Sequence, residues 1–156
     1  MPKQRDVVKM TDAEIEKFFG EVKSLNVATL NKDGAPHLTT LWFSLKDGNI
    51  LFETYGTSQK VVNLRRDPRV AVLSEAGDEY SQLRGVSITG QAEIVDREPR
   101  LSQLMGEILK RNHPGIEGQE FEDYVARMVR KRVVVVVRPE KVMSWDHRKL
   151  GATAAP

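Results

Sequence analysis

Apolar side chains recur along this chain with two spacings, one typical of amphipathic helices and one typical of half-buried strands. The helical spacing comes first, within residues 11–24. Thr11 is followed three residues later by Glu14, which is a capping-box pattern for a helix start. One face then collects the apolar side chains of Ile15, Phe18, Phe19 and Val22. We therefore predict an amphipathic helix over 11–24 with one buried face.

Runs rich in β-branched and aromatic residues follow, and short turn signals separate them. Asp33-Gly34 and Asp47-Gly48 each lie between two such runs, a pattern typical of hairpins because glycine supplies the positive φ of the turn. Six strands are predicted: 25–31, 35–46, 49–55, 69–76, 81–96 and 132–146. The five successive valines at 133–137 predict burial on both faces of the last strand. One face would meet a barrel interior, and the other a helix or another subunit.

Two further helices are predicted in the second half of the chain. Residues 97–112 carry an apolar stripe, with Asp96 as a cap and Pro99 in the first turn. His113-Pro114-Gly115 breaks this pattern, and a second amphipathic stretch covers about 119–131. The apolar positions of the two stretches are Leu101, Leu104, Met105, Ile108, Phe121, Tyr124, Val125 and Met128.

Many short strands with hairpin turns and few helices favour a small, closed or partly closed antiparallel β-barrel in a mainly β protein with helices (α+β). Gly85 and Gly90, inside one long strand, predict bulges or the sharp bends at which barrels turn corners. We divide the chain into an N-terminal arm (1–10), one barrel domain (11–146) and a C-terminal tail (147–156), frayed from Leu150 onward.

Composition excludes several classes of protein. The 156 residues suit one domain, and 40% hydrophobic with 29% charged residues is typical of a soluble globular chain. No apolar run approaches the roughly 18 residues that cross a bilayer, and MPKQRDVVKM is not a secretory signal, so no membrane partner is expected. The absence of cysteine fits a cytoplasmic location. A net charge of +2, from 24 basic and 22 acidic side chains, argues against a dedicated nucleic-acid binder.

The stretch from Thr54 to Leu73, TYGTSQKVVNLRRDPRVAVL, raises the question of an anion site. Thr57 or Ser58 would cap a helix or donate a hydroxyl to a phosphate, since a helix start presents unpaired N–H groups. Lys60 lies in the first turn, where the helix dipole favours acids, so its charge is misplaced unless an anion binds there. The alternative is a capped surface helix with solvated arginines, and the residues alone leave both interpretations open.

No side-chain constellation for catalysis stands out. His37, His113 and His147 have no spacing suited to a metal pair, and simple exposure explains His37 better than contact with a ligand does. No Ser-His-Asp arrangement, P-loop or GxGxxG motif is present. The cations at 127–132 are better explained as the C-terminal turn of a helix than as a nucleic-acid site. If the protein is an enzyme, these observations favour chemistry on a bound cofactor.

The order of these elements resembles the split β-barrel flavin-binding superfamily named after pyridoxamine 5′-phosphate oxidase. The resemblance covers about 11–145 and is most specific in S-x-K-x-x-N-L-x-x-D-P-R-V (58–70) and G-x-A-E (90–93). Within that superfamily the chain is more similar to the actinobacterial branch that uses the deazaflavin coenzyme F420 or, in some members, FMN. The resemblance implies a six-stranded antiparallel split barrel of the FMN-binding type.

Carried over by position, the resemblance implies a set of cofactor-binding residues: Thr39, Thr40, Thr54, Tyr55, Thr57, Ser58, Lys60, Asn63, Arg66 and Trp145. Lys60 would be the direct phosphate cation, with Asn63 and Arg66 supporting the turn or reaching the anion. The threonines of the second strand would line the flavin ring. The resemblance further implies a homodimer with the cofactor at its interface, where Arg84 or Trp145 of a second copy would complete the pocket.

The function implied is that of an oxidoreductase that takes hydride from reduced F420 and passes it to a small unsaturated substrate. FMN in place of F420, or a non-catalytic cofactor carrier, are the alternatives. Arg65, Arg66 and Arg69 exceed the needs of one phosphate, which favours the longer anionic tail of F420 unless they are merely solvated. The chain ends HRKLGATAAP rather than in the Arg-Leu-x-Pro type of segment, so vitamin B6 oxidation is not expected.

Overall fold

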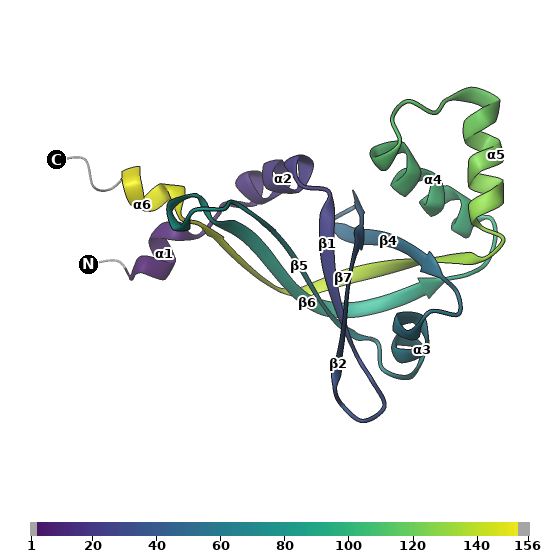
Figure 1. Ribbon diagram of the computed structural model, residues 1–156, viewed down its shortest axis with the longest axis horizontal. Coiled ribbons are helices and arrows are strands. Elements are labelled where there is room, and N and C mark those ends of the chain that lie inside the picture. Colours follow the sequence, from purple (N-terminus) through teal and green to yellow (C-terminus); the bar gives the residue numbers. More distant parts are fainter. Residues whose placement is uncertain (1–2, 153–156) are drawn as a thin grey trace.

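The computed structural model describes residues 3–152 and contains a curled antiparallel sheet flanked by helices (Figure 1). The elements, in order, are α1 (Gln4–Val8), α2 (Asp12–Glu21), β1 (Ser24–Leu30), β2 (Pro36–Trp42), β3 (Ser44–Lys46), β4 (Asn49–Tyr55), α3 (Gln59–Arg66), β5 (Arg69–Ala76), a 3₁₀ turn η1 (Tyr80–Gln82), β6 (Arg84–Val95), α4 (Arg100–Asn112), α5 (Gly118–Met128), β7 (Arg132–Asp146) and α6 (Arg148–Ala152). The sheet has seven strands in the order β2-β1-β5-β6-β7-β4-β3.

The two edge strands of this sheet, β2 and β3, are separated in sequence by Phe43 alone. The sheet therefore curls until its edges approach each other at that residue, which gives the split half-barrel that was predicted. The strand count of six was wrong because the run at 35–46 breaks at Phe43. The break at Phe43 depends on residues far along the chain. The Phe43 carbonyl accepts hydrogen bonds from Arg111 Nη1 (2.6 Å) and Asn112 Nδ2 (3.2 Å) instead of pairing with a neighbouring strand.

The five valines of β7 are buried on both faces, as predicted. Val135 and Val137 belong to the barrel core, which also contains the side chains of Phe18, Leu25 and Phe52. Val134 and Val136 belong to a second core, completed by residues of α4 and α5 that include Leu104, Met105 and Phe121. One strand thus forms the wall between two hydrophobic cores, and helices of the same chain cover its second face.

The predicted helices are present with shifted ends. The capping box of α2 is formed, with Thr11 N donating to Glu14 Oε2 (2.7 Å) and Glu14 N donating to Thr11 Oγ1 (3.3 Å). The helix stops at Glu21, short of the predicted residue 24, because the chain is already extended at Val22. Asp96 is not the cap of α4, whose N-cap is Pro99. Residues 129–131 form the turn into β7 rather than the end of α5.

Glycine has a steric role at two positions of β6. The pairing of β6 with β7 shifts register between Thr89 and Gly90, which confirms the predicted bulge there. A Cβ at Gly90 would collide with the backbone carbonyl of Arg138. The pairing at Gly85 shows no such shift; its Cα lies beneath the indole ring of Trp145, which would occupy the place of a Cβ. Both positions therefore require glycine because of close approach.

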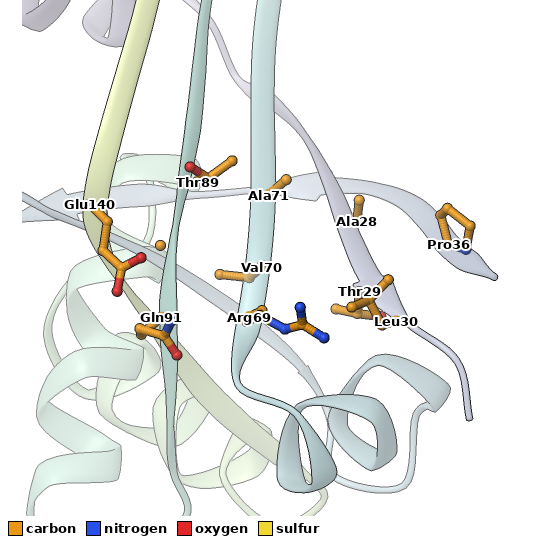
Figure 2. Close-up of a pocket in the computed structure, with 11 residues that line it drawn as sticks. Ala28, Thr29, Leu30, Pro36, Arg69, Val70, Ala71, Thr89, Gln91 and Glu140 are labelled. Carbon is orange, nitrogen blue, oxygen red and sulfur yellow. The ribbon is translucent and has the colours of Figure 1, made fainter. Parts of the chain in front are cut away.

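The outer face of the sheet carries a groove across β1, β5 and β6 (Figure 2). Its floor is mostly small and apolar, with Ala28 and Ala71 near the middle, and Arg69 and Glu140 are its charged members. Leu38, on the neighbouring edge strand β2, leaves 67% of its surface exposed. None of the described helices is long and apolar enough to cross a membrane.

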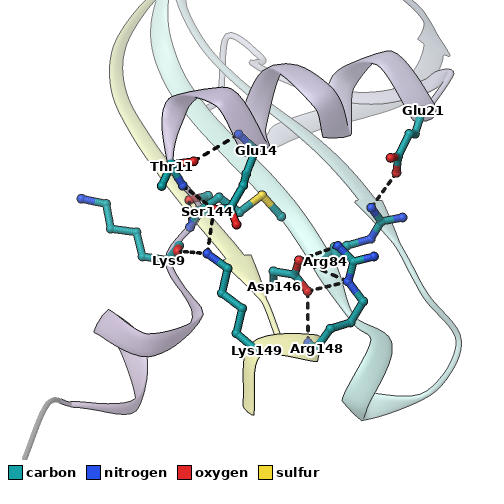
Figure 3. A network of polar contacts seen from close by, with 10 residues as sticks. Lys9, Thr11, Glu14, Glu21, Arg84, Ser144, Asp146, Arg148 and Lys149 are labelled. Carbon is teal, nitrogen blue, oxygen red and sulfur yellow. Dashed lines mark hydrogen bonds and ion pairs between the residues drawn. The ribbon is translucent and has the colours of Figure 1, made fainter. Parts of the chain in front are cut away.

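Two helices were not predicted, and both lie at the end of the β6–β7 arm (Figure 3). Lys149, in α6, donates to the carbonyl of Lys9 and to Glu14 Oε2, both at 2.7 Å, and so ties the tail to the N-terminal arm. The expectation that the tail is frayed from Leu150 is wrong for residues 150–152, which belong to α6; 153–156 lie outside the described residues. Helices this short leave almost no periodic signal in the sequence.

Arg111→Met is expected to destabilise the fold by about 2–4 kcal/mol, because three carbonyls would lose a charged donor. Its guanidinium donates to the carbonyls of Phe43 (2.6 Å), Phe19 and Val22 (2.7 Å), joining α4 to the end of α2 and to the break between β2 and β3. Burial lowers the pKa of Arg111, and its guanidinium lies 4.3 Å from the centroid of the Phe43 ring. Urea denaturation measures the loss. The neighbouring Lys110→Met is the control, and equal midpoints for the two variants would contradict the prediction.

Candidate functional site

The turn between β4 and α3 is held by backbone hydrogen bonds. Ser58 N donates to the Tyr55 carbonyl (3.0 Å) and Gly56 N to the Lys131 carbonyl (3.0 Å). Ser58 is the N-cap residue of α3, but its hydroxyl makes no capping bond; it accepts from Thr54 Oγ1 at 3.3 Å. The first N–H groups of α3 therefore receive no side-chain cap, and such groups bind anions readily.

Lys60 adds a positive charge beside this helix start. Its Nζ donates to Thr54 Oγ1 at 3.2 Å, and within residues 3–152 no carboxylate lies at salt-bridge distance from it. Burial lowers the pKa of Lys60, against a smaller opposing effect of Glu53. Thr54, Ser58 and Lys60 thus form one cluster, and Thr57 is exposed on the adjoining turn. A half-buried ammonium with only a hydroxyl partner is suited to an incoming anion.

Asn63 supports this cluster from inside the protein. Its Nδ2 donates to Thr29 Oγ1 (3.0 Å) and Asn31 Oδ1 (2.9 Å), and its Oδ1 accepts from Gln59 Nε2 (2.9 Å). The side chain is fully buried, at 0% exposure. Of the two roles considered for Asn63, the structure favours support of the turn over contact with the anion, because its amide is already satisfied.

The arginines after the cluster have protein partners. Arg65 pairs with Asp96 (3.1 Å), and Arg69 pairs with Asp67 (2.7 Å), which lowers the pKa of Asp67 to about 2. Arg66 Nη2 donates to the carbonyl of Leu30. These contacts within the protein explain the three arginines without a cofactor tail. Their number therefore no longer favours F420 over FMN.

Thr39 and Thr40 point to opposite faces of β2, because side chains alternate along a strand. Thr40 Oγ1 donates to Asn26 Oδ1 at 2.6 Å on the outer face. Thr39 is paired in register with Val27, a barrel-core residue, so it faces inward. Thr39 Oγ1 and His37 Nδ1, two residues apart on that face, are buried and have no hydrogen-bond partner within the described residues. Buried polar atoms are almost always paired, so these two fit the polar edge of a ligand.

Sequence reasoning did not select His37, which joins the candidate residues on the strength of its unpaired nitrogen. The sequence contained a signal for this role, because His37 and Thr39 are two residues apart on one strand and therefore point to the same face. Among the described residues there is no group of three or more histidines and carboxylates that could hold a metal ion. The donors that the site does offer are hydroxyls, an imidazole, backbone N–H groups and an ammonium, which suits a phosphorylated heterocycle.

Tyr55, the last residue of β4, lies beside the first residue of β7, whereas Trp145 lies near the other end of β7. Tyr55 is paired in register with Arg132, whose guanidinium lies 4.0 Å from the centroid of the phenol ring. Trp145 is 13 residues further along the strand, which corresponds to about 40 Å if extended. Within one chain Trp145 therefore does not meet the cluster at Lys60. It could do so only from a second copy.

Comparisons with known proteins show which family the chain belongs to and which solved structures share its fold. The chain matches the family model described as pyridoxamine 5′-phosphate oxidase over residues 11–146. A conserved hypothetical protein from Mycobacterium tuberculosis is 45% identical, with a TM-score of 0.88 over 96% of this chain and 93% of that one. A heme storage protein from Vibrio cholerae (17% identity, TM-score 0.68, 85% and 94% coverage) and an F420 reductase (21%, 0.58, 91% and 98%) share the fold.

Proposed function

Because this chain belongs to the pyridoxamine 5′-phosphate oxidase family, we propose that it binds a flavin-type coenzyme, with the phosphate at the start of α3 and the ring against the inner face of β2. Lys60 is the observation that carries the proposal. Its ammonium is half buried, has no carboxylate partner among the described residues, and lies beside uncapped helix N–H groups. In the empty protein the burial, the missing carboxylate partner and the nearby N–H groups all disfavour the charge of Lys60. A bound phosphate would neutralise that charge and accept hydrogen bonds from the N–H groups.

Reduced F420 is our first choice of coenzyme, and a small unsaturated compound our choice of substrate. When bound, the deazaflavin supplies a hydride donor, so no side-chain nucleophile is required. The protein then has to hold the coenzyme and to orient its ring toward the substrate. Ser58 and Lys60 would fix the phosphate, and Thr39 and His37 would hydrogen-bond the polar edge of the ring. The barrel wall would keep water from one ring face, leaving the other for the substrate.

FMN remains the second candidate, and one observation supports it. Arg65, Arg66 and Arg69 all have protein partners, so they give no reason for an acidic tail next to the phosphate. Vitamin B6 oxidation is not part of the proposal. Two cations of the tail, which a substrate phosphate would otherwise attract, are engaged within the chain: Arg148 pairs with Asp146 (2.6 Å) and Lys149 with Glu14 (2.7 Å).

The decisive experiment is a titration of the purified protein with F420 and with FMN, followed by fluorescence quenching. We expect saturable binding of one coenzyme with clear preference over the other. Oxidation of the reduced, bound coenzyme by a panel of enones and quinones would then separate an enzyme from a carrier. The absence of binding to either coenzyme would contradict the proposal, and binding without turnover would support the carrier.

We also propose that the protein is a homodimer whose second copy covers the outer face of the sheet. That face carries the groove of Figure 2 and the exposed Leu38, and within residues 3–152 the edge strands β2 and β3 each pair with a strand on one side only. Apolar faces and open edges of this kind are usually covered by another chain. Arg84 is already paired with Glu21 at 2.6 Å, so Trp145 is the better candidate to reach the pocket of the other copy.

Leu38→Asp is expected to shift the dimer toward monomer, because it introduces a charge on the apolar face that the second copy would cover. We expect at least a tenfold rise in the dissociation constant, equivalent to about 1.4 kcal/mol. Sedimentation equilibrium measures it. Leu45→Asp, at an exposed leucine of β3, is the matched control. A monomeric wild-type protein, or equal effects of both substitutions, would contradict the proposed interface.

A further inference from the structure

A second cavity, of about 520 Å³, lies between α2, the β3–β4 turn and the middle of β7. It exists because β7 is longer than one of its two neighbours. β4 pairs with β7 only up to Val137, whereas β6 continues beside it to Asp146. Within residues 3–152 no strand pairs with the β4 side of β7 beyond Val137. Helix α2 lies along the resulting gap and leaves the cavity beneath it.

The floor of this cavity is apolar and belongs to the barrel core. Phe19, Ile50 and Ile88 are buried members of that core, and each of them also lines the cavity. Two large apolar side chains remain exposed at its rim, Leu45 with 37% of its surface and Val142 with 45%. A concave surface with an apolar floor and exposed apolar side chains is typical of a ligand-binding site.

The charged side chains at the rim are mainly acidic. Asp12, Glu16 and Asp47 are exposed, and within residues 3–152 none of them takes part in an ion pair. Lys46 also lines the cavity, but it is bound to Glu107 at 2.9 Å. That contact, with a smaller effect of Asp47, raises the pKa of Lys46. The rim therefore keeps three negative charges that no neighbouring cation neutralises.

An apolar floor below an acidic rim is complementary to a small organic cation. The apolar body of such a molecule would displace water from the core side chains, while its ammonium group stays at the rim and faces Glu16 and Asp47. An anion of the same shape would be repelled by the carboxylates, and a neutral molecule would gain the apolar contact alone. The volume is sufficient for a drug-sized molecule.

We propose that this cavity binds a small amphipathic cation, an alkyl- or arylamine that is protonated at neutral pH, with Glu16 and Asp47 as its charge contacts. The site does not overlap the cluster at Lys60. Ile50 in the cavity and Thr54 in the cluster are four residues apart on β4, which corresponds to about 13 Å along the strand. The inference does not depend on the proposed function, and it gives the protein a second ligand site.

The test is an NMR titration of the isotope-labelled full chain with three probes of equal chain length and different charge: hexylamine, hexan-1-ol and hexanoate. Backbone amide shifts of α2 and of the β3–β4 turn report occupation of the cavity. The variant is Glu16→Gln with Asp47→Asn, since asparagine tolerates the positive φ of residue 47. The charge-matched control is Glu75→Gln with Asp78→Asn, at two exposed acids outside the cavity. Thermal unfolding confirms that both double variants retain the fold.

We expect hexylamine to shift these amides saturably, hexan-1-ol to bind more weakly and hexanoate not to bind. The cavity variant should lose about 2- to 30-fold in affinity for hexylamine, given two exposed charge contacts, and should keep its affinity for hexan-1-ol. Equal binding of amine and alcohol by the wild type, an equal loss in the control variant, or no shift at the cavity would overturn the inference. Shifts of the same amides on dilution of the protein without a probe would show that a second copy covers the cavity, and would also overturn it.

Discussion

Replacing Lys60 with alanine is expected to weaken coenzyme binding by about 1.5–3 kcal/mol, roughly 10- to 150-fold, with the fold retained. The loss should be equal for F420 and FMN, because the phosphate subsite is common to both. Fluorescence titration of the variant measures it, with Lys110→Ala as a control that removes an exposed lysine from α4. Unchanged affinity in Lys60→Ala would contradict the assignment of the phosphate to this cluster.

The stability of the empty protein gives an independent prediction for the same residue. Burial lowers the pKa of Lys60 below its usual 10.5, so the unfolded chain holds this proton more tightly than the native one. The charge on Lys60 is therefore unfavourable to folding at neutral pH, and this effect disappears as the pH rises through the native pKa toward 10.5. We expect Lys60→Met to be at least as stable as the wild type at pH 7 without coenzyme. A clear loss of stability in urea would show that Lys60 has a structural role.

Replacing Gly90 with alanine is expected to have the largest effect on the fold, a loss of about 3 kcal/mol or more. The added methyl group would meet the carbonyl of Arg138 and the Cα of Pro139, and backbone atoms cannot rotate away as a side chain can. Relief would require β6 and β7 to separate at their register shift. Urea denaturation and the yield of soluble protein measure the effect.

Gly20→Ala is the matched control for this substitution. Nothing lies within 4 Å of a Cβ at Gly20, which is near the end of α2, so alanine should raise stability slightly through its higher helix propensity. Similar denaturation midpoints for Gly90→Ala and the wild type would mean that the strand pair adapts and that the close approach is not essential.

Much of the fold could be predicted because its signals are local. The Asp-Gly turns, the alternation of the strands and the capping box at Thr11 each depend on residues within a few positions of one another. The break at Phe43 could not be predicted, because it depends on Arg111 and Asn112, nearly seventy residues away. The terminal helices were missed for the same reason, since contacts between the two ends of the chain hold them.

In the candidate site, too, the contacts between residues close in sequence could be predicted, and those between distant residues could not. Thr54, Ser58 and Lys60 lie within seven residues, so the sequence already grouped them, and the structure places their polar atoms in hydrogen-bond contact. Asn63 Nδ2 and the Arg66 guanidinium donate to groups more than thirty residues away, and only the structure shows that these donors are already engaged. Likewise, G-x-A-E (90–93) was part of the family resemblance, and only the structure shows what its residues do: Gly90 allows two strands to approach, and Glu93 pairs with Arg100 and Arg138.

The wall formed by β7 has a consequence for biosynthesis. Translation proceeds from the N-terminus, and neither hydrophobic core can close before residues 132–137 leave the ribosome, because alternate valines of that run complete one core and then the other. Until then Phe18 and Phe52 on one side, and Met105 and Phe121 on the other, lack their common neighbour. We expect nascent chains that end before β7 to be bound by chaperones and cut readily by proteases. Both hydrophobic cores should then become protected from proteolysis together, once the last strand has emerged.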